Sequence, residues 1–251
     1  MSKEQEKGDL GHDRDLQPAA YDGNAVSGQQ GQGNSDPVRL ANTALSYITH
    51  TLVAGLTAYL LYVSFRTYQL FSWHPACVTI GSLTLMAEAI MAMSRGNVLT
   101  AGLRRPTRVR AHWVLQLLAA GFVLCGFVVE VVVKRTSDRP HFASPHSVLG
   151  LVYVVLVVAS NCGGLAANYS ARLRDHVRLA AVKLAHFLLG AATFALGVCA
   201  LVTGLYTRFF SVSAGREAQL ACTVLLVVVA LLVLQSAARS VYSLCRSLLR
   251  V

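Results

Sequence analysis

Six apolar stretches dominate this chain, and each is long enough to cross a membrane. A bilayer core of about 30 Å needs roughly 20 helical residues to span it. The stretches lie at about residues 41–64, 69–93, 112–134, 146–168, 184–206 and 219–242. Backbone polar groups in lipid must be satisfied within their own segment, so each stretch is expected to be helical. The sequence predicts an all-α membrane protein whose bundle of six transmembrane helices occupies residues 39–246.

The distribution of charge supports this fold class. Only 14% of the residues are charged, whereas about 25% is usual for soluble domains. Seven of the twelve acidic residues lie in the first 36 positions, so the net charge of +10 belongs to short basic segments between the apolar stretches. Basic loops that frame apolar segments indicate membrane topology rather than nucleic-acid binding.

The two ends of the chain are expected to be cytosolic. Residues 1–38 contain few large apolar side chains and are expected to form a disordered tail, without a cleavable signal peptide. Residues 247–251 would form a short C-terminal end. Of the 22 Lys and Arg residues, sixteen fall on the side that carries both termini, and this excess marks the cytosolic side. An endoplasmic-reticulum or vesicle membrane is favoured over the plasma membrane.

Four histidines open four consecutive spans: His74, His112, His146 and His186. Consecutive helices run in opposite directions, so their openings alternate between the two membrane faces. Topology therefore predicts two layers, with His74 and His146 toward the non-cytosolic face and His112 and His186 toward the cytosolic face. Six-coordinate haem iron takes one imidazole on each side, and the interiors of helix bundles hold such cofactors.

Glycine follows four residues after the third and fourth of these histidines, at Gly150 and Gly190, and recurs at Gly197 and Gly204. This spacing places small residues on the histidine face of each helix, where they would leave room for a flat macrocycle. The same pattern is also typical of close packing between membrane helices. The six cysteines, all in or at the ends of apolar stretches, are expected to be free thiols.

Three other ionisable groups lie within or beside the spans. His50 has no partner that the sequence identifies, and is expected to be structural or to lie behind the cytosolic pair. Glu88 is 14 residues past His74, about 21 Å along an α-helix, and so near the cytosolic layer, where a carboxyl group could manage protons or neutralise an arginine. Glu130 is expected to pair with Lys134, four residues later.

Several motifs resemble the cytochrome b561 family over about residues 40–245: "LFSWHP", "LMAEA", "HWVLQLLA", the S-x-H start of the fourth span and the K-L-x-H-x-x-x-G start of the fifth. The likeness is to its short branch of cytochrome-b561-domain-containing transmembrane reductases. It implies two haem b groups between helices two to five, held by His74 with His146 and by His112 with His186. It also implies an ascorbate-dependent oxidoreductase that passes electrons from cytosolic ascorbate to the monodehydroascorbate radical or ferric iron, and relatives that form homodimers.

The chain departs from the better-known members of that family at two places. It reads "EAIMAMSRG" where they carry an "ALLVYR"-like stretch associated with ascorbate, and "SPHSV" where they carry "SLHSW". Both differences bear on the identity of the donor and the acceptor more than on the haem sites.

Basic residues near each face are candidates to contact charged partners. Ascorbate is an anion at neutral pH, and a cationic surface would concentrate it. The cytosolic candidates, for ascorbate or haem propionates, are Arg108, Arg110, Arg178 and Lys183, and the non-cytosolic candidates, for the acceptor, are Arg135, Arg139 and His141. Topology or loop solvation alone would also place cations at these positions.

Two other functions compete with electron transfer. A divalent-metal transporter would gather its ligands with carboxylates near the midplane, whereas these histidines lie in two layers near the helix ends. A non-catalytic scaffold would leave the two layers unexplained.

Overall fold

The computed structural model describes residues 37–94, 96–169 and 179–249, and each regular element in these ranges is helical. Six of its helical segments are long and apolar enough to cross a membrane: Arg39–Phe65, Leu70–Ala92, Arg105–Thr136, Pro145–Tyr169, Ala180–Leu205 and Arg208–Ala238. The predicted all-α fold with six membrane-spanning helices is confirmed.

The elements follow one another as α1 (Pro37–Phe65), η1 (Leu70–Ser72), α2 (Trp73–Val78), η2 (Thr79–Met86), α3 (Ala87–Ala92), α4 (Arg105–Thr136), α5 (Pro145–Tyr169), α6 (Leu179–Leu205) and α7 (Arg208–Leu249). Helix α1 takes in the last two positions of the expected tail, because Pro37 suits the first turn of a helix. Residues 1–36 of that tail and residues 250–251 of the expected C-terminal end lie outside the described residues.

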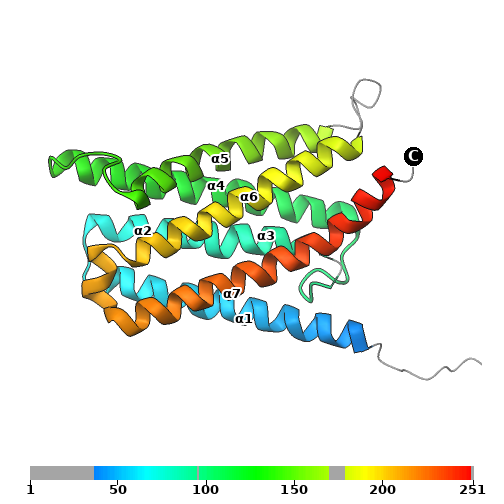
Figure 1. Ribbon diagram of the computed structural model, residues 1–251, viewed down its shortest axis with the longest axis horizontal. Helices are drawn as coiled ribbons and strands as arrows, with labels where there is room; N and C mark the ends of the chain where they lie inside the picture. The colour runs from blue at the N-terminus through cyan, green and yellow to red at the C-terminus, as the bar shows by residue number, and fades with distance from the viewer. Residues whose placement is uncertain (1–36, 95, 170–178, 250–251) are drawn as a thin grey trace, which may run out of the picture. The chain divides into compact units, whose positions relative to one another are not determined.

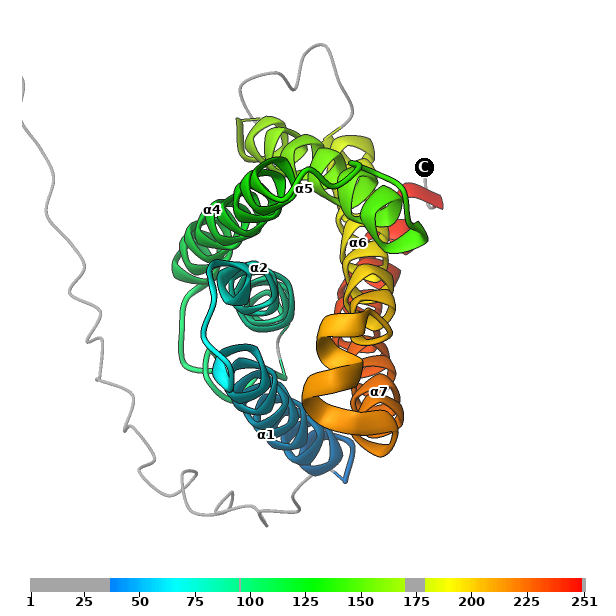
Figure 2. The same cartoon turned by 90° about the vertical axis from the view of Figure 1, so that its left-hand side faces the viewer.

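The long helices alternate in direction, so α1 begins and α7 ends at the same end of the bundle (Figure 1). Figure 2 looks along the bundle and shows α1, α7, α6, α5 and α4 arranged in a ring, with α2 on its inner side. The second span is accordingly the most enclosed: 61% of its most apolar window is buried, against 39% or less for each of the others. The elements of the second span therefore pack against most of the others.

The middle of the bundle is a tightly packed core around Tyr153 and Phe194, whose side chains are 2% and 1% exposed. The hydroxyl groups of Tyr153 and Ser82 lie 2.7 Å apart and share a hydrogen bond. A β-carbon at Gly197 would lie 2.7 Å from a carbon of the Tyr153 ring. Glycine at this position lets α6 approach α5 over the flat face of the tyrosine.

The second span is not the continuous α-helix that its sequence predicts, because residues Thr79–Met86 form a π-helix, η2. A β-carbon at Gly81 would lie 2.8 Å from Val123 Cγ2 and 2.9 Å from the Ala119 carbonyl oxygen, so glycine is needed where η2 meets α4. Wide helical turns of this kind recur at functional sites. The distance of about 21 Å between His74 and Glu88 assumed α-helical rise throughout, and the π-helix corrects that assumption.

The last helix begins eleven residues earlier than predicted, at Arg208. The charged and glycine-containing sequence of residues 208–217 is typical of a loop, but its first turns bury Phe210 in the core. Gly215, with φ 78° and ψ 170°, breaks the helix between this short segment and the membrane-spanning part. Only glycine adopts such a backbone conformation without strain.

We expect Gly197→Ala to destabilise the protein, because the new methyl group would overlap a tyrosine ring that its hydrogen bond to Ser82 holds in place. Overpacking of this kind costs about 1–3 kcal/mol. The measurement is the thermal unfolding midpoint in detergent. Gly121→Ala in α4 is the matched control, because no atom lies within 4 Å of the position that its new methyl group would take. An equal effect of the two substitutions would contradict the assignment of Gly197 as a packing position.

Candidate functional site

The structure brings the four histidines together in two pairs. The ring centres of His74 and His146 lie 6.2 Å apart, and those of His112 and His186 lie 6.3 Å apart, with the ring planes nearly perpendicular in both pairs. Each pair joins two helices that are not consecutive spans: α2 with α5, and α4 with α6. Because each histidine is near the start of its helix, the two pairs lie toward opposite ends of the bundle.

Backbone carbonyl groups fix the orientation of three of these rings. The Nδ1–H groups of His74, His112 and His146 donate hydrogen bonds of 2.9, 2.8 and 3.0 Å to the carbonyl oxygens of Gly126, Ala89 and Ala200. A carbonyl oxygen only accepts, so Nδ1 carries the proton and Nε2 keeps its lone pair. This is the arrangement of histidines that bind a metal through Nε2.

The fourth ring, His186, is held differently. Its Nδ1 is buried and has no hydrogen-bond partner in the described part of the chain. Two glycines of α5 border the ring instead: a β-carbon at Gly164 would lie 3.0 Å from His186 Cε1, and one at Gly163 would lie 3.8 Å from Nδ1. The sequence pattern did not reveal these glycines, because they belong to a different helix from the histidine.

The glycines noted in the sequence on the histidine faces of their helices lie in different surroundings. A β-carbon at Gly204 would lie 3.2 Å from His146 Cε1, so Gly204 borders the other histidine pair. Gly150 has no atom within 4 Å of its β-carbon position, and Gly190 has only the Ser160 hydroxyl group at 3.7 Å. Gly150 also lines the cavity described next.

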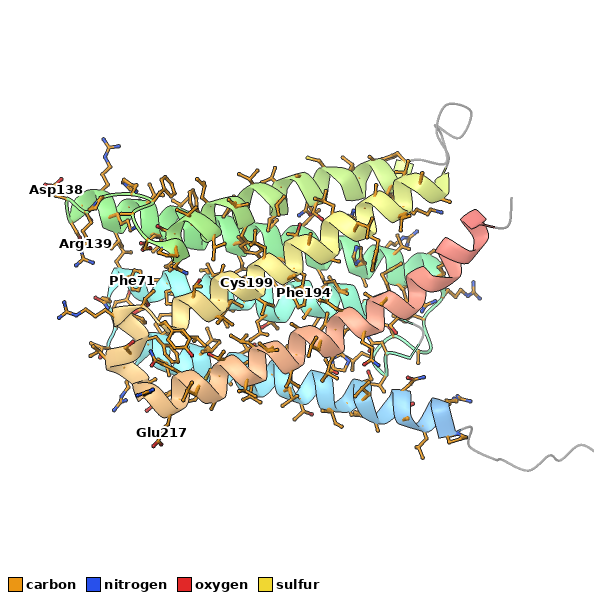
Figure 3. The ribbon with its side chains drawn as sticks, in the orientation of Figure 1. Phe71, Asp138, Arg139, Phe194, Cys199 and Glu217 are labelled. Carbon is orange, nitrogen blue, oxygen red and sulfur yellow. The ribbon has the colours of Figure 1, made fainter. Side chains whose placement is uncertain are left out.

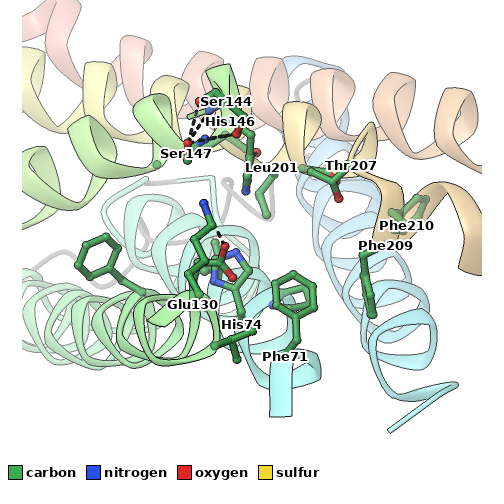
Figure 4. A pocket seen from close by; sticks show the side chains of 18 of the residues that line it. Phe71, His74, Glu130, Ser144, His146, Ser147, Leu201, Thr207, Phe209 and Phe210 are labelled. Atoms are coloured by element: carbon green, nitrogen blue, oxygen red, sulfur yellow. Dashed lines mark hydrogen bonds and ion pairs between the residues drawn. The ribbon is translucent and has the colours of Figure 1, made fainter. Parts of the chain in front are cut away.

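A cavity of about 1120 Å³ opens at the His74–His146 pair (Figure 4). Two imidazoles that bind one metal from opposite sides, through bonds of about 2 Å, have ring centres roughly 6 Å apart. The separations of both pairs, the free Nε2 atoms and the space beside glycine therefore fit a haem with two axial histidines.

Charged side chains surround the outer part of this cavity. Its lining includes the cations Lys134, Arg139 and Arg208, the imidazole of His141 and the carboxylate of Glu130. The predicted ion pair is confirmed, with 3.6 Å between Lys134 Nζ and Glu130 Oε1, and the other carboxylate oxygen of Glu130 is buried without a partner among the described residues. Figure 3 shows Arg139 at the same end of the bundle as Phe71. Arg135 is exposed and does not line the cavity.

The basic residues that we expect on the cytosolic side differ in their burial. Arg108 donates a hydrogen bond of 3.4 Å from Nη1 to the Ser94 carbonyl group, while its Nε is buried and has no partner in the described ranges. Arg110 and Lys183 are exposed. Arg178 lies outside the described residues.

His50 has partners that the sequence did not reveal. Its Nδ1 lies 2.8 Å from Glu88 Oε1, and its Nε2 lies 3.0 Å from Asn97 Oδ1. Glu88 directly precedes Ala89, whose carbonyl group accepts the hydrogen bond from His112, so Glu88 lies at the level of the His112–His186 pair. Its partner is a histidine rather than an arginine. Separations of 38 and 47 residues left no local pattern from which to find this cluster.

Two further expectations concern metals and thiols. Within residues 37–94, 96–169 and 179–249, no three His, Cys, Asp or Glu side chains gather to hold a metal ion. The five cysteines whose side chains are described are free, as expected, and Cys245 lies outside that set.

Membrane-crossing helices with facing histidines between them define a multi-pass membrane protein of the haem-binding class. Residues 73–211 match the eukaryotic cytochrome b561 family, and the chain belongs to this family. It is 31% identical to transmembrane reductase CYB561D2 of Mus musculus, over 69% of this chain and 78% of the relative. It is 30% identical to probable transmembrane reductase CYB561D1 of Homo sapiens, over 77% and 84%.

A more distant relative is lysosomal membrane ascorbate-dependent ferrireductase CYB561A3 of Mus musculus, 29% identical over 58% of this chain and 59% of the relative. Family membership makes the protein an oxidoreductase that binds haem b and transfers electrons across a membrane. The chemistry between donor and acceptor is that of the cofactor, and the protein supplies its binding, orientation and electrostatic surroundings.

We expect Gly164→Ala to weaken haem binding at the His112–His186 pair, because the methyl group would press on a ring that packing alone orients. Overpacking of about 1–3 kcal/mol corresponds to a loss of roughly fivefold to a hundredfold in affinity. The measurement is the haem-to-protein ratio after purification. Gly163→Ala, whose methyl group would make only an ordinary contact, serves as the control. Equal ratios in the two variants would show that Gly164 does not shape the site.

Proposed function

We propose that the protein passes electrons from cytosolic ascorbate, through two haem b groups, to the monodehydroascorbate radical or ferric iron on the opposite side of the membrane. The observation that carries this proposal is the arrangement of the four histidines in two facing pairs toward opposite ends of the bundle. A haem with two axial histidines supplies one-electron transfer through its iron. The name of one relative, an ascorbate-dependent ferrireductase, supports both the donor and ferric iron as an acceptor.

In this proposal His112 and His186 hold the cytosolic haem, and His74 and His146 hold the non-cytosolic haem. The excess of Lys and Arg on the side of the termini supports this orientation. All four ligands come from one chain, so a homodimer would contain two complete relays. The membrane is that of the endoplasmic reticulum or a vesicle, and the lysosomal membrane in one relative's name agrees with an internal membrane.

The described cation best placed for the donor side is Arg108. It lies four residues before His112, on the same face of α4, and its buried Nε has no partner in the described chain. A guanidinium group binds carboxylate and other anionic oxygens through its fixed fork of donors. We assign Arg108 to a haem propionate or to ascorbate. The exposed Arg110 and Lys183, together with Arg178, would attract the anion to this surface.

On the acceptor side, Arg139 and His141 line the outer cavity, together with Arg208. The positive charge of Arg139 and Arg208 would attract an anionic acceptor, whether the ascorbyl radical or a ferric chelate. Arg135 does not line the cavity, so the proposal rests on Arg139 and His141 at this end.

A packed core lies between the two pairs. Tyr153 is seven residues past His146, about 10 Å along α5, and Phe194 is eight residues past His186 on α6. Both side chains are fully buried. Tyr153 also lines the cavity at the His74–His146 pair.

Alanine substitution of each histidine tests the ligand assignment. We expect two haems per chain in the wild-type protein and one in each single variant, because an axial ligand is lost. His74→Ala and His146→Ala should lose the same haem spectrum, and His112→Ala and His186→Ala the other, in absorption spectra of the reduced protein. His141→Ala should keep both haems. Loss of different haems by the two members of one pair would refute the pairing.

Vectorial transfer tests the direction of the relay. In vesicles with ascorbate on the side of the termini, His112→Ala should abolish haem reduction by ascorbate. His146→Ala should leave the cytosolic haem reducible and reduce transfer to an acceptor on the opposite side at least tenfold. The measurement is haem absorbance together with acceptor reduction. Ascorbate that acts only from the side opposite to the termini would invert the proposed orientation.

A further inference from the structure

We propose that His50, Glu88 and Asn97 form a proton-binding site that takes up one proton when an electron arrives at the cytosolic histidine pair. The inference rests on the proposed function, because it needs a haem held by His112 and His186. The inference adds to that function a group that binds a proton and so compensates the charge of the electron. The haem ligands themselves do not provide such a group. We call these three residues the His50 cluster.

The His50 cluster joins three separate parts of the chain. His50 comes from α1, Glu88 from α3, and Asn97 from the segment between α3 and α4. The His50 ring lies between the carboxylate, at 2.8 Å, and the amide oxygen, at 3.0 Å. Asn97 is 3% exposed, whereas the side chains of His50 and Glu88 keep 14% and 22% exposure. The pair is therefore enclosed but still reachable by a proton.

The hydrogen bonds define how many protons the cluster holds. The backbone N–H of Leu99 donates to Asn97 Oδ1 over 2.9 Å, so this oxygen is an acceptor and is not the amide nitrogen. The bond from His50 Nε2 to the same oxygen therefore carries a proton on Nε2. A separation of 2.8 Å between His50 Nδ1 and Glu88 Oε1 requires another proton between these two atoms, since two lone pairs would repel. The histidine and carboxylic acid together thus share one exchangeable proton and have no net charge.

The cluster lies close enough to the cytosolic pair to respond to its charge. Glu88 is covalently adjacent to Ala89, whose carbonyl oxygen accepts the 2.8 Å hydrogen bond from His112 Nδ1. Coulomb's law gives the size of this response. For a separation of about 10 Å and an effective dielectric constant of about 20, one added unit charge changes the protonation equilibrium of an ionisable group by roughly tenfold. An electron added at this layer therefore favours a proton at the cluster.

Among the side chains that the structure describes, few other ionisable groups lie on the elements packed against the cluster. Helix α4 packs against α3 and presents Arg108 and His112, which are bonded to the carbonyl groups of Ser94 and Ala89. Helix α7 also packs against α3, but residues 225–238 contain no ionisable side chain, and neither does η2. On α1 itself, Arg39 and Tyr47 are exposed, as is Arg104 before α4. The described groups other than His50 and Glu88 are thus an always-charged arginine, a proposed iron ligand or solvated side chains.

The proposed step balances in charge. A haem held by His112 and His186 would supply one-electron transfer at this layer. The arrival of one electron there would be matched by one proton from cytosolic water, which would add to the free carboxylate oxygen of Glu88. When the electron passes to the other layer, the proton returns to the cytosol. The net charge of the cytosolic layer is the same before and after each transfer, which limits the cost of placing charge in a low-dielectric region.

The test is an equilibrium redox titration of the purified protein with chemical mediators, followed by absorbance at several pH values around neutrality. The transition that is lost in His112→Ala identifies the cytosolic haem. In the wild-type protein we expect its midpoint potential to fall as pH rises, with uptake of up to one proton per electron in weakly buffered solution. The variant with both His50→Gln and Glu88→Gln should lose this dependence. A midpoint that is independent of pH in the wild-type protein would overturn the proposal without any variant.

The single variants separate charge from structure. Glu88→Gln leaves the cluster without net charge but removes the oxygen that takes the proton, so the midpoint should match the wild type at high pH and lose most of its rise toward low pH. His50→Gln leaves the carboxylate unpaired and should lower the midpoint. A purely structural role would leave the pH dependence of the midpoint unchanged in both variants. Thr84→Val is the matched control, because it removes the 2.8 Å hydrogen bond between Thr57 of α1 and η2 without changing any charge, and it should keep the pH dependence of the wild-type protein.

The outcomes distinguish this inference from the function on which it rests. Absence of a haem transition that depends on His112 would refute the proposed function. Presence of that transition, with the same pH dependence in the double variant as in the wild-type protein, would refute only the role of the His50 cluster.

Discussion

The hydrogen bonds from histidine rings to backbone carbonyl groups are the interactions on which the site depends. Each of the three crosses between elements: His74 of α2 to Gly126 of α4, His112 of α4 to Ala89 of α3, and His146 of α5 to Ala200 of α6. In a helix these carbonyl oxygens already accept a backbone bond, and their second lone pair remains available. One contact thus joins two helices, sets the tautomer and directs Nε2 toward the partner ring.

Such contacts require helices that approach more closely than ordinary side chains allow. A β-carbon at Gly126 would lie 2.8 Å from Val78 Cγ2 and 3.1 Å from the His74 carbonyl oxygen, so glycine is what brings the Gly126 carbonyl group within reach of the His74 ring. Gly81 lies further along the second span and likewise allows it to approach α4 closely. Lipid gives little driving force for helix association, and small residues with interhelical hydrogen bonds supply it instead.

The sequence was sufficient where a single physical constraint acts on a local segment. Apolar length alone predicted six spans, and the alternation of helix direction predicted which histidines share a layer; their role as iron ligands stays a prediction. The π-helix at Thr79–Met86 was not predictable, because it depends on how Gly81 meets Val123 of another helix. The break at Gly215 and the early start of α7 likewise depend on burial of Phe210. The partners of His50 were missed because they lie 38 and 47 residues away, and no periodicity connects them.

The two histidine pairs are not equivalent. Both rings of the pair at the cavity are anchored, by Gly126 and by Ala200 with Thr203, whereas His186 has no such anchor in the described chain and relies on the glycines beside it. An imidazole without a fixed second nitrogen is a weaker electron donor to a metal and is freer to rotate. If each pair holds one haem, as proposed, the cofactor at His112 and His186 would accordingly dissociate first on warming or in mild detergent stress, leaving a half-loaded protein with haem only at His74 and His146.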